Sequence, residues 1–358
     1  MALGSEGATA RVTLRDVARV ANVHPGTASR ALNDDTRGLV NEETARRVLE
    51  AAAALGYRPN PIARGLKTNR SYTIGVLIPD LTNPLFPPIL RGIEDRLEEG
   101  GYTPLMANTD NDPERERIDW HAMRARQVDG IVAATARRDH ELLDELIEAG
   151  IPVVLVNRRA PDSGVPSATA DDRQGIRLSV EHLAALGHTR IAHIAGPLEL
   201  STGLDRHEGF HDAMRELGLE PDPELVVITR AFTEAEGARA CAELLDRGGG
   251  PTAIAAANDL IALGCYDVFA ERGLSCPDEI SVVGFNDMPF AGRFQPPLTT
   301  IRIPHYEIGM AAAELMLERL LDDGTPPRDV LLEPSLVTRA SAAPPASGAD
   351  GLPGLRSG

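Results

Sequence analysis

Cysteine, aromatic residues and lysine are scarce in this chain of 358 residues. The three cysteines, Cys241, Cys265 and Cys276, are odd in number and lack Cys-x-x-Cys spacing. We therefore expect buried free thiols rather than a metal site or a disulfide framework. Lys67 is the only lysine, all other basic side chains apart from histidine being arginines, and this bias indicates no mechanism.

Long apolar runs are missing as well. No stretch reaches about 18 consecutive apolar residues, so the sequence predicts no transmembrane helix and no membrane partner. The N-terminus has no charged region followed by an apolar one, so we expect no secretory signal. By elimination, the sequence predicts a cytoplasmic location.

Motifs of catalysis are also missing. The chain has no nucleophile elbow, no His-Glu-x-x-His motif and no P-loop lysine. We therefore expect neither an enzyme nor a bound cofactor. His182 and His188 flank the predicted helix end at Leu186-Gly187, where capping is a simpler role than catalysis.

Charge is distributed unequally along the chain, whose formal net charge is -17. Residues 1–70 contain 11 basic and 7 acidic residues, whereas the remainder contains 25 basic and 46 acidic ones. Because phosphate attracts positive charge, only the N-terminal part suits contact with nucleic acid, and salt should weaken that contact.

The segment 13–33 is typical of a helix-turn-helix. Thr13 can cap a first short amphipathic helix, with Asp16 completing part of a capping box. Residues 21–23 lead into a second helix that has Pro25 in its first turn. In this motif the second helix enters the DNA major groove, so sequence-directed DNA binding is the first hypothesis.

Further segments complete the N-terminal part. Residues 33–38 are predicted as a loop, and Asn41 can cap a third helix that ends at Gly56. The residues of this helix that are spaced for burial are Ala45, Val48, Leu49 and Ala52. A short helix can start at Asn60, but isolated helices below about 12 residues are marginal in water, so it needs support.

From residue 72 the pattern changes to alternating strands and helices. Apolar runs predict strands at 73–78, 130–134, 152–156, 190–195, 252–257 and 280–285. Amphipathic stretches predict helices at 86–99, 113–127, 139–149, 172–186, 206–217, 234–246, 259–272 and 305–322. Such alternation is typical of doubly wound parallel sheets, and the number of units indicates an α/β core of two lobes.

These patterns predict a domain organisation. It has a helix-turn-helix domain at 12–58, a linker at 59–71, a core at 72–340 and a tail at 341–358. The first lobe of the core is predicted at 72–169 plus 303–327, and the second at 172–299 plus 330–340. The tail is rich in Ala, Pro, Gly and Ser and is expected to be disordered.

Motifs in a fixed order run through all these parts. They are Val12-Thr13-Leu14-Arg15-Asp16-Val17-Ala18, Thr27-Ala28-Ser29-Arg30, Leu55-Gly56-Tyr57-Arg58-Pro59-Asn60, Ile74-Gly75-Val76, Pro79-Asp80-Leu81-Thr82-Asn83-Pro84, Val128-Asp129-Gly130, Ala257-Asn258-Asp259, Ser281-Val282-Val283-Gly284-Phe285 and Pro297-Leu298-Thr299-Thr300-Ile301. In order and spacing they resemble the LacI/GalR family of bacterial transcription regulators from about residue 12 to 340. The resemblance implies a core like that of periplasmic sugar-binding proteins.

The resemblance also implies a function. A homodimeric repressor would bind a pseudo-palindromic operator, associated with the nucleoid when bound, with one recognition helix in each major groove. Hinge helices at 60–67 would pair in the central minor groove, where Leu66 would separate a base step. A small effector, a mono- or oligosaccharide, would lie between the lobes. Pro87-Pro88 departs from the family pattern, so the helix that follows Asn83-Pro84 is expected to begin near Phe86, with its outer face in the dimer interface.

The predicted DNA-binding residues are Thr13, His24, Pro25, Gly26, Thr27, Ser29, Arg30, Asn33, Arg37, Asn60, Ala63, Arg64, Leu66 and Lys67. Arg30 is the best candidate for base contact, since its guanidinium can bind guanine O6 and N7 together, and a phosphate contact is the alternative. Pro25 and Gly26 stand where the family has base-contacting side chains. His24 replaces the family's usual serine cap and can either cap the helix or reach DNA, so no operator sequence is predicted.

The predicted effector-binding residues are Leu85, Phe86, Ile89, Asn157, Arg206, Phe232, Asn258 and Asn286. Arg206 aligns with the family's cleft arginine, although an ion pair at a helix start is the alternative. The asparagines follow predicted strands, where ligands bind in open α/β sheets, and turn capping would also explain them. Together the residues suggest a neutral, hydroxyl-bearing ligand.

The sequence departs from the family pattern around this pocket. Asn stands at 157 and 286 where the family often has Asp, so the pocket is less anionic than a typical sugar site. Ile303 and His305 also stand at cleft positions. A solute-binding receptor without a DNA role is the alternative function, but the basic N-terminal part and the missing secretory signal argue against it.

Overall fold

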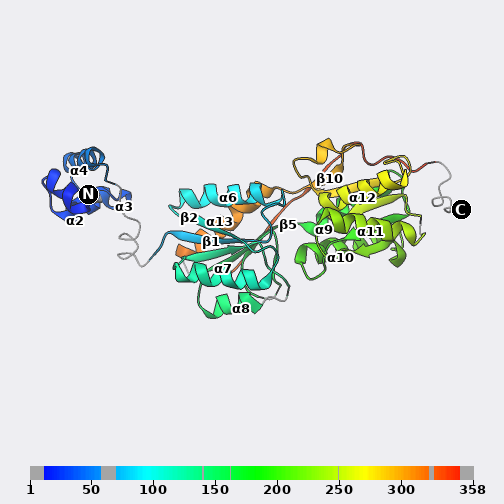
Figure 1. Ribbon diagram of the computed structural model, residues 1–358, viewed down its shortest axis with the longest axis horizontal. Helices are drawn as coiled ribbons and strands as arrows, with labels where there is room; N and C mark the ends of the chain where they lie inside the picture. Colours follow the sequence, from blue (N-terminus) through cyan, green and yellow to red (C-terminus); the bar gives the residue numbers. More distant parts are fainter. Residues whose placement is uncertain are drawn as a thin grey trace, which may run out of the picture. The chain divides into compact units, whose positions relative to one another are not determined.

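The computed structural model describes residues 12–57, 70–138, 141–161, 163–248, 250–321 and 326–346. The chain divides into two compact units, residues 1–71 and 72–358. Figure 1 shows the small helices of the first unit and the two α/β lobes of the second.

Within its described residues the first unit consists of the helices α1 (Leu14–Val20), α2 (Pro25–Ala31), α3 (Asp34–Arg37) and α4 (Glu42–Leu55). Thr13 and Asp16 form the capping box of α1, and Asn41 caps α4. Gly56 ends α4 with a φ of 62°, a left-handed conformation that favours glycine. The predicted loop at 33–38 is wrong in part, because α3 occupies four of its residues.

Small side chains form the core of this unit. Val17 and Ala18 of α1 and Ala28 of α2 are buried against Val48 of α4. Alanines on facing helices let the backbones approach closely, which gives three short helices a common core. The expected burial of Leu49 is wrong, since the side chain is 38% exposed and Ala51 and Ala52 face the core instead.

In its described residues the second unit contains two six-stranded sheets. The strands of the first, in spatial order, are β11 (Asp329–Leu332), β5 (Ser167–Ala170), β4 (Val153–Val156), β3 (Gly130–Ala133), β1 (Thr73–Ile78) and β2 (Thr103–Asn108), all parallel. Those of the second are β12 (Ser335–Val337), β10 (Thr299–Arg302), β9 (Ser281–Asn286), β8 (Ala253–Ala256), β6 (Ile191–Ala195) and β7 (Val226–Ile228). Only β12 is antiparallel to its neighbour.

Helices cover both faces of each sheet, as Figure 1 shows. In the first lobe they are α6 (Phe86–Glu99), α7 (Pro113–Ala125), α8 (Glu141–Glu148) and α13 (His305–Leu321). In the second they are α9 (Asp172–Ala185), α10 (Ser201–Glu216), α11 (Glu234–Asp246) and α12 (Asp259–Arg272). The start of α6 is as predicted, whereas α10 begins five residues before the predicted one.

Alternation along the strands explains why each sheet has two covered faces. In the first lobe, Val132 and Val154 belong to the cluster with α6 and α13, whereas Ile131 and Val153 pack with α7 and α8. Successive side chains of a strand point to opposite faces, so strands that are apolar throughout need helices on both sides. This confirms the predicted pair of doubly wound parallel lobes.

A pair of glycines brings α6 and α13 close together. A Cβ on Gly92 would lie 2.1 Å from the carbonyl oxygen of Tyr306, and one on Gly309 would lie 2.0 Å from that of Ile89. Only glycine fits at these two positions, so the two helices pack backbone against backbone. This fixes the start of α6, which borders the space between the lobes.

The chain crosses between the lobes after β5, after β10 and between β11 and β12. The expectation that 330–340 lies in the second lobe is therefore wrong for 330–332, since β11 pairs with β5 in the first sheet. The sequence of residues 330–332 contains no pattern that indicates which of the two sheets this short strand joins.

The expected disorder of the tail is wrong for residues 341–346. Ser341 is fully buried, and its Oγ donates to the carbonyl of Val282. The ring Nε2 of His188 bonds the carbonyl of Ala343 at 2.9 Å, so His188 holds the tail rather than capping a helix. Residues 347–358 lie outside the described part of the chain.

No helix in the described residues is both long and apolar enough to cross a membrane. Cys241 and Cys265 are buried free thiols, as expected, and Cys276 is free and half-buried. In the described ranges no three His, Cys, Asp or Glu residues come together in a way that could hold a metal.

Candidate functional site

Helix α2 presents one face to solvent and buries the other. Ala28 and Ala31 are buried in the core of the first unit, whereas Arg30 is exposed. The Nδ1 of His24 accepts a hydrogen bond from the backbone N–H of Gly26 at 3.1 Å, so His24 caps α2. Because the cap uses Nδ1, the other ring nitrogen remains available at the N-terminal end of the helix.

Other predicted DNA-binding residues hold the domain together. The hydroxyl of Thr13 donates to Asp16 at 2.7 Å within the capping box. The Nε of Arg37 donates to the carbonyl of Ala31 at the end of α2, at 3.1 Å. These two side chains fix helix ends, which leaves Arg30 as the exposed cation on α2.

The remaining predicted DNA contacts divide into two groups. Pro25, Gly26, Thr27, Ser29 and Asn33 are half-buried along α2 and just after it. Asn60, Ala63, Arg64, Leu66 and Lys67 lie outside the described residues. The role of all these residues in DNA binding stays a prediction.

A cavity of about 240 Å³ opens between the two lobes of the core. It lies at the carboxyl ends of strands from both sheets, where open α/β sheets bind ligands. Its lining residues are Pro79, Asp80, Asn83, Leu85, Phe86, Asn111, Arg137, Asn157, Arg158, Pro197, Glu199, Leu200, Thr202, Arg206, Arg230, Ala231, Phe232, Thr233, Asn258 and Asn286.

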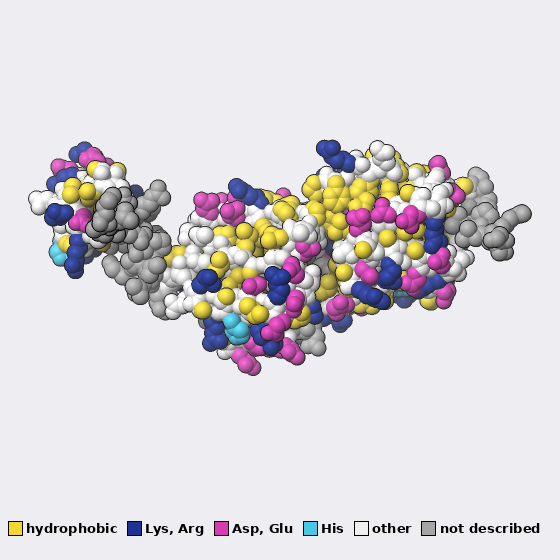
Figure 2. All heavy atoms as spheres, viewed as in Figure 1, with side chains coloured by type: hydrophobic (Ala, Val, Ile, Leu, Met, Phe, Trp, Pro, Cys, Tyr) yellow, Lys and Arg dark blue, Asp and Glu magenta, His cyan; other side chains and the backbone are white. Residues whose placement is uncertain are grey.

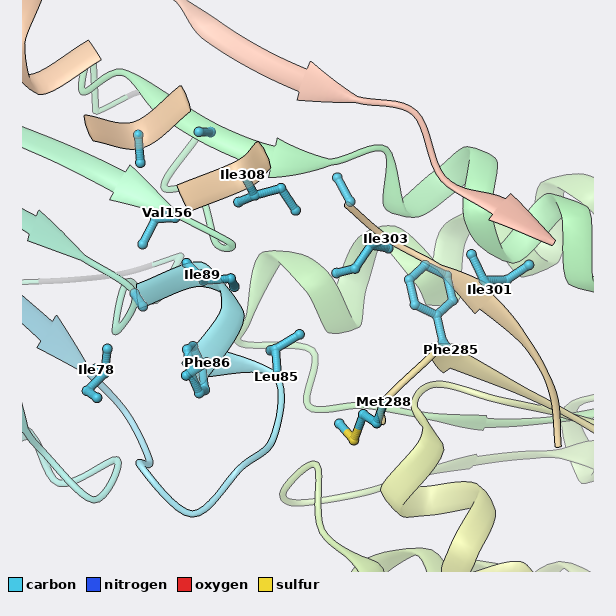
Figure 3. Packing of buried hydrophobic residues seen from close by; sticks show 14 of the residues in the cluster. Ile78, Leu85, Phe86, Ile89, Val156, Phe285, Met288, Ile301, Ile303 and Ile308 are labelled. Atoms are coloured by element: carbon cyan, nitrogen blue, oxygen red, sulfur yellow. The ribbon is translucent and has the colours of Figure 1, made fainter. Parts of the chain in front are cut away.

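Seven of the eight predicted effector-binding residues line this cavity. The exception is Ile89, which is 1% exposed and packs in the hydrophobic core of the first lobe. Its backbone oxygen lies against Gly309, so the close contact of α6 with α13 turns Ile89 away from the cavity. Figure 3 shows Ile89 one turn beyond Leu85 and Phe86, with Met288 on the side of the other lobe.

Ile303 and His305 do not line the cavity either. Ile303 is 1% exposed and belongs to the core cluster. Burial lowers the pKa of His305 to about 4, so this ring is neutral at the start of α13. The expectation that these two residues occupy the cleft is wrong.

Arg206 lies on the second-lobe wall and is only 4% exposed. Its Nε and Nη2 lie 2.8 and 2.7 Å from Oδ1 of Asp172, and its Nη1 donates to the carbonyl of Ala257 at 2.6 Å. The guanidinium also stacks on the ring of Phe285, 3.8 Å from its centroid. Arg206 is therefore a buried cation with a full set of partners, not a surface ion pair.

The partner of Arg206 is itself buried. Burial raises the pKa of Asp172 to about 6, and Arg206 opposes this rise. The carboxylate is charged at neutral pH and balances the guanidinium. Neither charge is left without a partner, so removing one of the two side chains would leave the other buried and uncompensated.

The three asparagines at strand ends differ in what their side chains do. The Oδ1 of Asn258 accepts from Ile261 N at 2.8 Å and caps α12. Asn157 makes no side-chain hydrogen bond with described residues, and the buried Oδ1 of Asn286 has no hydrogen-bond partner. Capping therefore explains Asn258 but not the other two.

The backbone at these two asparagines is unusual. Asn157 has a φ of 63° and Asn286 a φ of 105°. Non-glycine residues rarely take positive φ, and such strained positions gather at ligand sites. Both amides line the cavity with polar atoms that are free to bond a ligand.

Sequence reasoning missed several charged lining residues. Arg137 and Arg158 come from the first lobe, and Arg230 and Glu199 from the second. Arg158 directly follows Asn157, so the strand-end position that identified Asn157 could have identified it as well. Burial, which distinguishes Arg158 from a surface arginine, could not be predicted from the sequence.

Direct contacts join the lobes beside the cavity. The guanidinium of Arg159, which follows β4, binds Asp205 of α10 at 2.7 and 3.2 Å. Its backbone N–H donates to the hydroxyl of Ser201 at 2.9 Å, and Arg138 N donates to Glu199 O at 3.0 Å. The geometry is thus that of two lobes held against each other around an enclosed space.

Comparison with known proteins identifies both units. Residues 13–60 match the model of bacterial regulatory proteins of the lacI family, and residues 180–342 match the periplasmic binding protein-like domain. The HTH-type transcriptional regulator RegA of Clostridium saccharobutylicum is 34% identical over 330 residues, which is 92% of this chain and 98% of that regulator.

Two solved structures resemble the chain over nearly its whole length. The lac repressor dimer bound to operator and the anti-inducer ONPF has a TM-score of 0.81 and 28% identity, covering 93% of this chain and 99% of that one. The transcriptional regulator CelR in complex with cellobiose has a TM-score of 0.72 and 32% identity, covering 93% and 100%.

Proposed function

Since the chain belongs to the LacI family of bacterial transcriptional regulators, we propose that it is a repressor that binds a pseudo-palindromic operator as a homodimer and responds to a sugar-class effector between its lobes. One observation carries the proposal. A single chain joins a lacI-type helix-turn-helix to two lobes that enclose a cavity at their strand ends.

The exposed face of α2 supports the DNA-binding part. Arg30 is exposed there, while His24 and Arg37 fix the two ends of the helix through hydrogen bonds. A rigid helix with one free guanidinium suits entry into the major groove and a bidentate contact with guanine. The lac repressor relative is a dimer bound to operator, which supports two such helices on one site.

The outer face of α6 supports the dimer. Together with β2 it forms a shallow groove lined by Val76, Leu81, Pro87, Leu90, Arg91, Ile93, Glu94, Pro104 and Met106. Leu81 is 50% and Met106 54% exposed, and Figure 2 shows hydrophobic side chains among charged ones over this part of the first lobe. Exposed apolar side chains that are grouped in this way suit a subunit interface.

The interlobe cavity supports the effector part. At about 240 Å³ it is smaller than the ~300–1,000 Å³ of drug-sized pockets, which suits a monosaccharide better than a longer sugar. Phe232 can cover one face of a sugar ring, and Asn157 and Asn286 offer amides to its hydroxyls. The CelR relative, bound to cellobiose, supports a sugar-class ligand.

The test is a footprint of the DNA upstream of the protein's own gene. Wild type should protect an inverted repeat, and Arg30→Ala should weaken protection roughly 10- to 100-fold because it removes one specific contact per half-site. Arg46→Ala, which removes an exposed arginine from α4, is the matched control and should change protection little. Equal protection by wild type and Arg30→Ala would show that α2 is not the recognition helix.

A further inference from the structure

Positive charge exceeds negative charge on the cavity lining. Arg137, Arg158, Arg206 and Arg230 line the cavity, against the acidic residues Asp80 and Glu199. Glu199 is exposed. Arg206 is balanced by Asp172 behind the wall, so the excess depends on the other arginines.

Arg158 is the most unusual of these. Only 7% of the residue is exposed, and its guanidinium makes no hydrogen bond or ion pair with the described residues. Burial and the nearby positive charge of Arg137 together lower its pKa to about 10, against the opposite effect of Glu116 and Glu199. A buried cation without a bonded partner is costly, and such groups are found where a ligand supplies the partner.

The neighbours of Arg158 do not satisfy it. The carboxylate of Glu116 is buried and accepts a hydrogen bond from the hydroxyl of Thr135, and its charge only partly offsets the burial of Arg158. Arg137 directs Nη2 to the carbonyl of Asn111 at 3.1 Å, so it adds charge beside Arg158 without a carboxylate of its own. Arg158 and Arg137 therefore both line the cavity, close enough for their charges to interact, with no bonded anion among the described residues.

Asn157 and Asn286 carry neutral amides, so neither side chain can balance the positive charge of Arg158 and Arg137 as a carboxylate would. Asn157 and Asn286 line the cavity as neutral groups, each with hydrogen-bonding capacity to spare. An amide can donate to an anion or bond a hydroxyl, but a carboxylate there would repel an anionic ligand. The cavity lining near Arg158 is therefore suited to a group that carries negative charge.

We propose that the effector is a hydroxylated molecule of about monosaccharide size that carries one carboxylate or phosphate group, bound by Arg158 and Arg137. This inference rests on the proposed effector role of the interlobe cavity. The planar fork of Arg158 matches two oxygens of a carboxylate or phosphate. Asn157, Asn286 and the ring of Phe232 then contact the hydroxylated part. A neutral sugar would leave the charge of Arg158 without a counter-ion.

The test uses matched probes on the purified full-length protein. The three sets are glucose, glucuronate and glucose 6-phosphate; galactose, galacturonate and galactose 6-phosphate; and ribose, ribonate and ribose 5-phosphate. Binding is measured by calorimetry at two salt concentrations. We expect one acid or one phosphate to bind at least about tenfold more tightly than its neutral match, and more weakly at high salt. Comparing the sugar acids with the sugar phosphates shows whether the bound anionic group is a carboxylate or a phosphate.

Variants show whether Arg158 supplies the selectivity. Arg158→Gln should weaken the anion at least about tenfold and leave the neutral match unchanged. Arg137→Gln, at a half-buried residue, gives the same test if Arg158→Gln fails to fold. Arg138→Gln removes an exposed arginine that does not line the cavity and should change neither ligand.

Two outcomes would overturn the inference. A neutral sugar that binds as tightly as its anionic matches, with Arg158→Gln weakening both equally, would leave an interlobe effector but not an anionic one. Binding of none of the nine probes would also count against it. Failure of the proposed function is judged separately, by the operator footprint.

Discussion

The two walls of the interlobe cavity bury arginines in opposite ways. On the second-lobe wall, Arg206 bonds Asp172 and Ala257 and stacks on Phe285. On the first-lobe wall, Arg158 is nearly as buried, but its guanidinium bonds no described residue. The difference shows that the fold itself supplies the partners of Arg206, whereas it supplies none among the described residues for the guanidinium of Arg158, which we propose a ligand does.

The largest expected effect is a loss of stability when the paired arginine of the second-lobe wall is removed. Arg206→Ala should lower the free energy of unfolding by about 3–5 kcal/mol, because it leaves Asp172 buried without its partner. The measurement is urea denaturation without ligand at pH 7.5. A loss below about 1 kcal/mol would show that the second-lobe pair contributes little to stability.

A smaller effect is expected in how the stability difference between wild type and Arg206→Ala changes with pH. The folded pKa of Asp172, about 6, is raised above 3.8, so this carboxyl group favours folding while protonated and loses that contribution as pH rises from about 4 to about 6. Without Arg206 the folded pKa rises further, so the loss continues at higher pH. The deficit of Arg206→Ala should therefore grow between pH 5 and 8, by about 1.4 kcal/mol for each added pKa unit.

The control for this slope is the double variant Arg206→Ala/Asp172→Asn. It carries no titrating group at 172, so its unfolding free energy should lack the added slope. Other buried carboxyls, such as Asp259 with a pKa raised to about 7 by burial, titrate in every variant and cancel in the comparison. Parallel curves for Arg206→Ala and wild type would mean that Arg206 does not control the ionisation of Asp172.

The smallest effect concerns the first-lobe wall. Arg158→Met keeps the length of the side chain and removes an unpaired buried charge, so the ligand-free protein should be unchanged or up to about 2 kcal/mol more stable. Urea denaturation beside Arg206→Ala gives the comparison directly. A loss as large as that of Arg206→Ala would mean that Arg158 has partners within the fold.

The fold could be predicted where the sequence carries long patterns. Buried apolar runs located β1, and helical periodicity located α6, α11 and α12, because these elements are long enough to show a period. The strands β7 and β12 have three residues each and gave no such signal. The helix α10 was predicted to begin too late, since its N-cap is Leu200, whose side chain cannot make a capping hydrogen bond.

The cavity was predictable in part for a related reason. Residues at strand ends, such as Asn157 and Asn258, follow from the general position of ligand sites in parallel sheets. Whether a polar side chain is paired depends on contacts between distant segments, as with Arg206 and Asp172, which are 34 residues apart. The sequence therefore predicted where the cavity lies but not which of its charges remain free.

The proposed function requires that an effector bound in the cavity change the affinity of α2 for the operator. Its most direct test is the operator affinity of the full-length protein, measured by fluorescence anisotropy with and without the tightest-binding probe, together with the affinity for that probe with and without operator. Coupled sites must change each other's affinity by the same factor, so we predict equal factors of about 5 to 150, which Arg158→Gln reduces at the same probe concentration. An operator affinity that does not change when the probe saturates the cavity would contradict the account.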